Sequence, residues 1–148
     1  MKKLILMILA TGILFSCGDD EPTIETIDTS MPQGTFTASK SGTFTEQNDT
    51  GSAGTAELGT DEKGTQFLHF GSNFTTNLGT GTVTVYLSTS DTYMADPGNG
   101  NPDLLLIAGV KSNGDQYFKL DPAADSKFTY VILWCGSASI PFGYAQLQ

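Results

Sequence analysis

The chain has 148 residues, of which 39% are hydrophobic and 16% are charged, a composition that suits one small domain with flexible ends. Its 16 aspartates and glutamates outnumber its 7 lysines, so the formal net charge is −9. The chain contains no arginine, and therefore lacks the side chain that clamps phosphate through two parallel hydrogen bonds. A negative field also repels polyanions, so we expect no nucleic-acid partner.

The first 16 residues have the organisation of a bacterial signal peptide. Lys2 and Lys3 give a basic start, residues 4–15 are an apolar stretch, and Ser16 is a small residue at the end. Twelve residues rise only about 18 Å as a helix, too short for the roughly 30 Å hydrocarbon core of a bilayer. Residues 1–16 are therefore predicted to be a signal peptide and not a membrane span.

The end of this signal, Leu14-Phe15-Ser16-Cys17, resembles a bacterial lipobox. The resemblance implies cleavage before Cys17 and lipid attachment to Cys17 through palmitate-type acyl chains, of which two already give stable membrane anchoring. The alternative is an ordinary secretory signal that leaves the Cys17 thiol free. Removal of residues 1–16 takes away two of the seven lysines, so the mature charge is 5 − 16 = −11.

Residues 17–33 are predicted to be an acidic, flexible tether, because acids, prolines and threonines mix there without a sustained period. Its first part, Gly18-Asp19-Asp20-Glu21-Pro22, resembles the acidic tag that sends some lipoproteins of Gram-negative bacteria to the cell surface. The resemblance implies a lipid-anchored, surface-exposed protein of the outer membrane. The alternative is a solvated spacer, with the domain on the periplasmic face.

From residue 34 onward the chain consists of short β segments separated by glycine-containing turns. The clearest segment is 80–88, where Val83, Val85 and Leu87 alternate with polar residues, as in a strand with one solvated face. Two copies of the tetrapeptide GTFT predict neighbouring strands at 35–37 and 43–45, with a turn at 39–42. Further strands are expected at 54–58, 66–70, 104–110, 116–120, 130–135 and 142–147. About eight short strands predict an all-β domain over residues 34–148, a single antiparallel β-sandwich.

The C-terminal half carries a family resemblance in three stretches: GVKSNGDQYFKL at 109–120, VILWC at 131–135 and IPFGYA at 140–145. They resemble the DM-thirteen domain family, also called the electron-transfer DM-thirteen domain, in which a GDQ turn precedes an aromatic-rich strand and a later strand closes in tryptophan-cysteine. The resemblance covers roughly residues 34 to 148. Two places depart from the family pattern: Thr80-Gly81-Thr82 replaces the usual Gly-Pro-Asp, and Ala138 replaces a frequent aromatic residue.

The resemblance implies a β-rich extracytoplasmic domain with a near-constant cysteine, here Cys135, for which a redox or electron-carrying role has been proposed. If Cys17 is acylated, Cys135 has no intramolecular disulfide partner. The alternation of Val131, Leu133 and Cys135 favours a buried thiol that packs as a small hydrophobe, while a reactive redox thiol or a cofactor contact stays open. On the packing interpretation, Cys135→Ser costs about 1–3 kcal/mol, because it buries a hydroxyl without a prepared partner.

Metal and haem sites have few candidate ligands. His69 is the only histidine and is expected on the solvated face of its strand; a non-covalent haem between His69 and Met94 is the haem option left open. The loop 91–103 lacks the bidentate glutamate of an EF-hand but offers oxygen atoms to Ca²⁺. Its candidate ligands are Asp96, Asn99, Asn101 and Asp103. We predict no resident cofactor and a plain turn at this loop.

The sequence contains no GxSxG motif and only one histidine, which gives hydrolytic catalysis little support. We therefore expect a protein that is not an enzyme. The first hypothesis is a non-catalytic binding or adhesion module with an unknown protein or glycan partner. The alternative is a redox or electron-transfer accessory protein that uses Cys135.

Overall fold

The computed structural model describes residues 28–95 and 100–148, and all their regular structure is β. The described part contains no helix that is long and apolar enough to cross a membrane. The eight strands are β1 (Thr37–Glu46), β2 (Thr55–Thr60), β3 (Gln66–Phe70), β4 (Val83–Ser88), β5 (Leu104–Gly109), β6 (Gln116–Leu120), β7 (Tyr130–Cys135) and β8 (Ile140–Gln146). The all-β, antiparallel prediction is confirmed.

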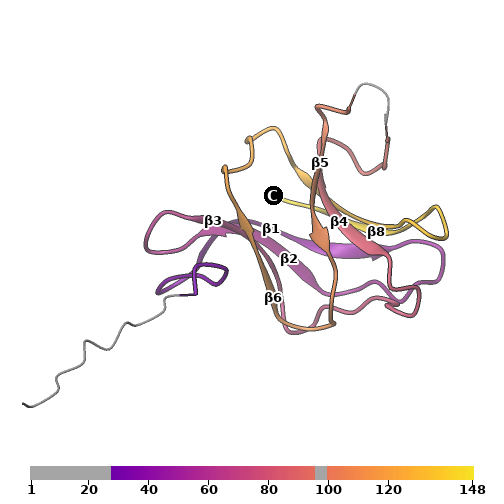
Figure 1. The fold of residues 1–148 in the computed structure, drawn as a ribbon, viewed down its shortest axis with the longest axis horizontal. Coiled ribbons are helices and arrows are strands. Elements are labelled where there is room, and N and C mark those ends of the chain that lie inside the picture. Colours follow the sequence, from indigo (N-terminus) through magenta and orange to yellow (C-terminus); the bar gives the residue numbers. More distant parts are fainter. Residues whose placement is uncertain (1–27, 96–99) are drawn as a thin grey trace, which may run out of the picture.

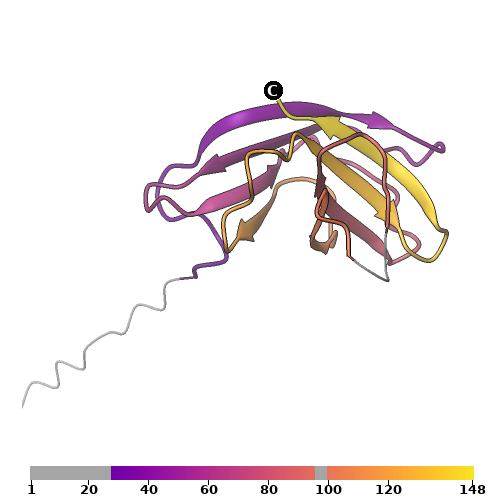
Figure 2. The same ribbon diagram turned by 90° about the horizontal axis from the view of Figure 1, so that it is seen from above.

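The strands form one antiparallel sheet in the order β5-β4-β7-β8-β1-β2-β3-β6. Figures 1 and 2 show that this sheet arches over, so that β1, β2, β3 and β6 face β4, β5, β7 and β8 across the core. The arch brings the two edge strands, β5 and β6, close to each other, and the sheet is nearly closed. The two facing layers of the predicted sandwich are thus halves of a single sheet.

Strand β1 connects the two halves. Its first part pairs with β2, and Phe44, Thr45 and Glu46 pair with β8. The prediction of two separate strands at 35–37 and 43–45 with a turn between them is wrong. Ser39 to Gly42 resemble a turn in sequence, but Ser41 bonds Gln148 on one side and pairs with Glu57 on the other, so tertiary pairing keeps the chain extended.

Gly42 is required within this long strand for a steric reason. A Cβ atom at position 42 would overlap the backbone carbonyl of Gln146. The glycine therefore allows β1 to pass against the end of β8 while a bulge between Ala38 and Lys40 bends the strand.

The core lies between the two halves of the sheet. Val83, Val85 and Leu87 point inward, as the alternation predicted, and Val131, Leu133 and Cys135 of β7 meet them. β7 lies between β4 and β8, and it is apolar on both faces because its outer face is also covered, with Ile132 only 1% exposed. An aromatic cluster fills the space under β3, with ring centroids 4.4–5.3 Å apart. Its members are Phe44, Phe70, Phe74 and Phe118.

Candidate functional site: an aromatic face and a hydroxyl-lined thiol

The outer surface of β4, β7 and β8 is aromatic. Tyr86, Ile132 and Tyr144 are direct cross-strand partners, and Trp134 lies two residues beyond Ile132 on the same face. We define the aromatic face as Tyr86, Tyr93, Tyr130, Trp134 and Tyr144, which are four of the five tyrosines and the only tryptophan of the chain. Aromatic side chains gathered on one solvated face are typical of binding surfaces.

The loop after β4 folds back onto this face. The ring of Tyr93 stacks on Trp134 with centroids 4.0 Å apart and an angle of 12°, and it meets Tyr86 edge-on at 5.1 Å. Ile132, between Tyr86 and Trp134, is consequently only 1% exposed although it points away from the core. Burial raises the pKa of Tyr93, and the hydrogen bond with Tyr86 raises it further. The Tyr93 phenol therefore stays neutral at physiological pH.

A hollow of about 220 Å³ lies beside the Tyr93–Trp134 stack. The residues that line it come from the end of β1, the loop after β4, and strands β7 and β8: Gln47, Asp91, Thr92, Tyr93, Trp134 and Pro141. Gln47 is fixed through its backbone N–H, which donates to the carbonyl of Phe142 at 3.0 Å. Its Oε1 is buried and accepts no hydrogen bond from any described residue. The hollow thus combines an aromatic wall, a carboxylate and an acceptor without a donor.

The Cys135 thiol lies on the inner face of β7, opposite to the face that carries Trp134. Its exposed fraction is 0%, which agrees with the prediction of a buried thiol. Its surroundings are nevertheless polar, since the Oγ atoms of Thr80, Thr82 and Ser137 lie 3.4, 3.4 and 3.5 Å from Sγ. We call these three residues the hydroxyl shell. All three are exposed, so only one layer of polar side chains separates the sulfur from solvent.

The hydroxyl shell changes the acidity of the thiol. Burial raises the pKa of Cys135, but hydrogen bonds with Ser137, Thr80, Thr82 and the Ala138 backbone outweigh burial and lower it to about 6. The expectation that a hydroxyl at position 135 would have no prepared partner is therefore wrong. Both departures from the family pattern noted in the sequence, Thr80-Gly81-Thr82 and Ala138, adjoin the thiol.

His69 is held on the outer face of the other half of the sheet. Its Nδ1 lies 2.8 Å from a carboxylate oxygen of Glu57, and its Nε2 lies 2.8 Å from a carboxylate oxygen of Asp115. Tyr117 stacks on the imidazole with centroids 4.2 Å apart. His69 is 9% exposed, so the expected solvated histidine is wrong. Because each ring nitrogen has a carboxylate partner, neither is free for a haem or a metal ion in this arrangement.

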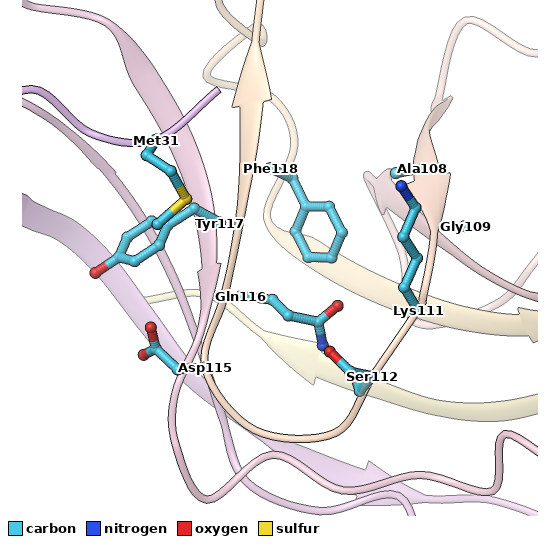
Figure 3. A pocket seen from close by; sticks show the side chains of 9 residues that line it. All are labelled: Met31, Ala108, Gly109, Lys111, Ser112, Asp115, Gln116, Tyr117 and Phe118. Atoms are coloured by element: carbon cyan, nitrogen blue, oxygen red, sulfur yellow. The ribbon is translucent and has the colours of Figure 1, made fainter. Parts of the chain in front are cut away.

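Two further hollows follow the seam between β5 and β6. The larger, of about 350 Å³, is drawn in Figure 3, where Phe118 and Gln116 of β6 face Ala108 and Lys111 across the gap. The smaller, of about 240 Å³, extends the seam past Leu106, which is 56% exposed. The arched sheet does not close at this seam, because no backbone hydrogen-bond ladder joins the edge strands β5 and β6.

The candidate calcium loop is described only in part. Asp96 and Asn99 lie outside the described residues. The Oδ1 of Asn101 accepts the backbone N–H of Asp103 at 2.9 Å, and a carboxylate oxygen of Asp103 lies 3.5 Å from the Lys127 ammonium. The side-chain oxygen of Asn101 and one carboxylate oxygen of Asp103 thus already have protein partners. Among residues 28–95 and 100–148, no group of three or more acidic, histidine or cysteine side chains could hold a metal ion.

The predicted signal peptide and the lipid attachment residue Cys17 also lie outside the described residues, together with most of the predicted tether. The domain boundaries of the sequence analysis stay predictions. The last tether residue, Gln33, is described, and its backbone N–H donates to a carboxylate oxygen of Asp61 at 2.9 Å.

These features define a class: a small all-β domain whose single sheet closes around an aromatic core and carries one buried thiol at the end of a central strand. Comparison with protein-family models matches residues 43–147 to the family described as Electron transfer DM13. The match covers most of the chain, so the chain belongs to this family, as the resemblance in the sequence indicated. Searches of the curated proteins and of the solved structures gave no match to this chain.

Sequence reasoning found Cys135 and its burial but missed the groups around it. Thr82 is 53 residues and Thr80 is 55 residues from Cys135 in the chain, and only the β4–β7 pairing brings them together. The aromatic face was missed for the same reason, because its members are spread from position 86 to position 144. The one sequence signal for the aromatic face was the alternation that places Tyr86 and Trp134 on the outer faces of their strands.

Proposed function

We propose that this chain is a membrane-anchored extracytoplasmic lipoprotein whose DM13 domain is a non-catalytic binding module, and that the aromatic face is its binding surface. The observation that carries this proposal is the gathering of four tyrosines and the only tryptophan on one outer face, beside a hollow lined by Gln47, whose buried Oε1 accepts no hydrogen bond from a described residue. Tyrosine and tryptophan give large contact areas at a small cost in side-chain entropy, and they dominate the energetics of many interfaces.

The point where the tether joins the domain is consistent with an aromatic face that is free to bind a partner. Gln33 bonds Asp61, and the backbone N–H of Thr35 donates to a carboxylate oxygen of Glu62 at 3.0 Å, so the chain enters beside the β2–β3 turn. These hydrogen bonds lower the pKa values of Asp61 and Glu62, so both carboxylates stay charged to a lower pH than usual. The junction belongs to the half of the sheet opposite β4, β7 and β8. A tether from a lipid at Cys17 would therefore join the domain on the side away from the aromatic face and leave that face uncovered.

A surface-retention assay tests the binding role. The chain from Cys17 onward, which retains every strand, is coupled to fluorescent beads through its N-terminus and passed over cells, secreted polysaccharide and matrix protein. We expect retention that is lost in Tyr93→Ala. The matched control is Tyr117→Ala, which makes the same change on the opposite half of the sheet and should leave retention intact. Equal retention of the two variants would contradict the proposal.

Lipid anchoring is tested separately. We expect the wild-type chain, expressed in a Gram-negative host, to fractionate with the outer membrane and to be digested by protease added to intact cells. Cys17→Ser should release the domain into the soluble fraction. Wild-type and Cys17→Ser chains that fractionate alike would refute the anchor, and protease resistance on intact cells would place the domain on the periplasmic face.

A redox role for Cys135 is the second candidate, because the hydroxyl shell lowers the thiol pKa to about 6 and the layer that covers the sulfur is thin. A thiolate is the reactive form of cysteine, but reaction also requires access. Labelling of the native protein by a thiol reagent discriminates the candidates. Rapid labelling, or a reversible change in the oxidation state of Cys135 with a physiological oxidant, supports the redox role. Labelling only after denaturation supports the binding role.

A further inference from the structure

The hollow beside the aromatic stack has the composition of a sugar-binding site. It has one wall of stacked aromatic rings, Tyr93 and Trp134, and its other lining groups include a carboxylate, a hydroxyl and an amide. The C–H face of a pyranose ring packs on an aromatic surface, and its hydroxyl groups both donate and accept hydrogen bonds. Sites for small molecules generally combine such an apolar wall with a few placed polar groups.

The unpartnered Oε1 of Gln47 indicates what the ligand must provide. This oxygen is buried and accepts no hydrogen bond from the described residues, and a buried acceptor without a donor is destabilising. Since the oxygen itself has almost no accessible surface, a ligand hydroxyl supplies the missing donor only when the Gln47 side chain turns its amide toward the hollow. Asp91 offers a second acceptor, since its carboxylate is occupied only by the hydroxyl of its neighbour Thr92, at 3.0 Å, among the described side chains. The ligand must therefore carry several hydroxyl donors.

Charge and size narrow the ligand class. Among the described residues that line the hollow, Asp91 is the only charged one and none is a lysine, and the chain as a whole is acidic, so a uronic or sialic acid would be repelled. A volume of about 220 Å³ is below the roughly 300–1,000 Å³ of sites that enclose a drug-sized ligand. The hollow thus fits one ring, while the neighbouring Tyr86 and Tyr144 can contact adjacent units of a chain.

From these observations we infer that the hollow formed by Gln47, Asp91, Tyr93 and Trp134 binds one pyranose ring of a neutral oligosaccharide or polysaccharide. This inference rests on the proposed binding function and names its ligand class. Asp91 and Gln47 act as acceptors for ring hydroxyls, and the aromatic stack packs against the face of the sugar.

The chain contains its own reporter for this site, because Trp134 is its only tryptophan. The protein from Cys17 onward is first applied to an array of neutral and uronic-acid oligosaccharides, and the retained glycans are then titrated while Trp134 emission is recorded. We expect saturable emission changes with neutral glycans and none with uronic-acid glycans. Asp91→Ala should weaken binding at least about tenfold, the factor expected for loss of a hydrogen bond to a charged acceptor. Asp121→Ala, which removes a carboxylate outside the hollow, should change nothing.

Two results would overturn the inference: no neutral glycan retained on the array, or binding that is equal in wild type and Asp91→Ala. The bead assay separates this failure from failure of the proposed function. Retention on a protein surface that is lost in Tyr93→Ala, together with an empty glycan array, would keep the binding module and reject the sugar. The folding of each variant is checked by the urea midpoint, so that loss of binding is not loss of structure.

Discussion

Replacing Cys135 by serine and by valine tests whether the hydroxyl shell or the apolar core defines this position. A serine hydroxyl would lie among the hydroxyls of Thr80, Thr82 and Ser137, whose oxygens are now 3.4–3.5 Å from the sulfur. One hydrogen bond contributes about 1 kcal/mol, and with the hydroxyls of Thr80, Thr82 and Ser137 all in reach a serine makes enough of them to offset most of the about 1–3 kcal/mol that an unpartnered buried hydroxyl costs. We expect Cys135→Ser to lower the free energy of unfolding by less than about 1 kcal/mol.

Valine is the informative comparison because it keeps an apolar side chain. It removes all three contacts of the sulfur and places methyl groups against the hydroxyls, so the expected cost is about 1–3 kcal/mol. Both variants are compared with wild type by urea unfolding, followed by Trp134 emission and by circular dichroism in parallel. The hydroxyl shell would be refuted if serine cost more than valine, because that order is the one expected of an apolar core position.

The remaining predictions concern the thiol and the aromatic core. The pH titration of the Cys135 thiol is followed by thiolate absorbance, with Cys135→Ala as the blank, and should show a midpoint near pH 6. Thr82→Val should raise this midpoint. A wild-type midpoint near 9.0, the ordinary pKa of a cysteine, would contradict the role of the hydroxyl shell. Because the folded pKa lies below the ordinary value, the thiolate contribution to stability is complete above pH 9 and is lost as the pH falls from about 9 to about 6. The free energy of unfolding of wild type, relative to Cys135→Ala, should therefore rise with pH across this window, and a flat difference would be inconsistent with the shift. Phe70→Ala should cost about 3–5 kcal/mol in urea melts, since Phe70 is fully buried against three other phenylalanine rings; a loss below about 1 kcal/mol would show that the cluster is not closely packed.

The sequence predicted those parts of the fold that depend on local alternation. Val83, Val85 and Leu87 have a period of two with polar residues between them, and they face the core as expected. The stretch from Ser39 to Gly42 has the composition of a turn but lies within β1, because hydrogen bonds from both neighbouring chain segments hold it extended. Local composition could not reveal those partners, which come from distant parts of the chain.

The candidate sites show the same limit. Alternation was sufficient to predict that Cys135 is buried, but the polarity around it depends on the pairing of β4 with β7. His69 was expected on a solvated face, and it does lie on an outer face. It is buried there because Glu57 of β2, Tyr117 of β6 and Asp115, directly before β6, surround it. Cross-strand neighbours, which a single sequence does not display, decide both environments.

Site-specific photo-crosslinking on intact cells tests the central claim most directly. A photoreactive phenylalanine analogue replaces Tyr93 on the aromatic face in one version of the full chain and Tyr117 on the opposite half in another. If the aromatic face is the binding surface, irradiation should join the domain to a discrete partner, protein or glycan, from position 93 and not from position 117. Crosslinking from position 117 alone, or equally from both positions, would contradict the account.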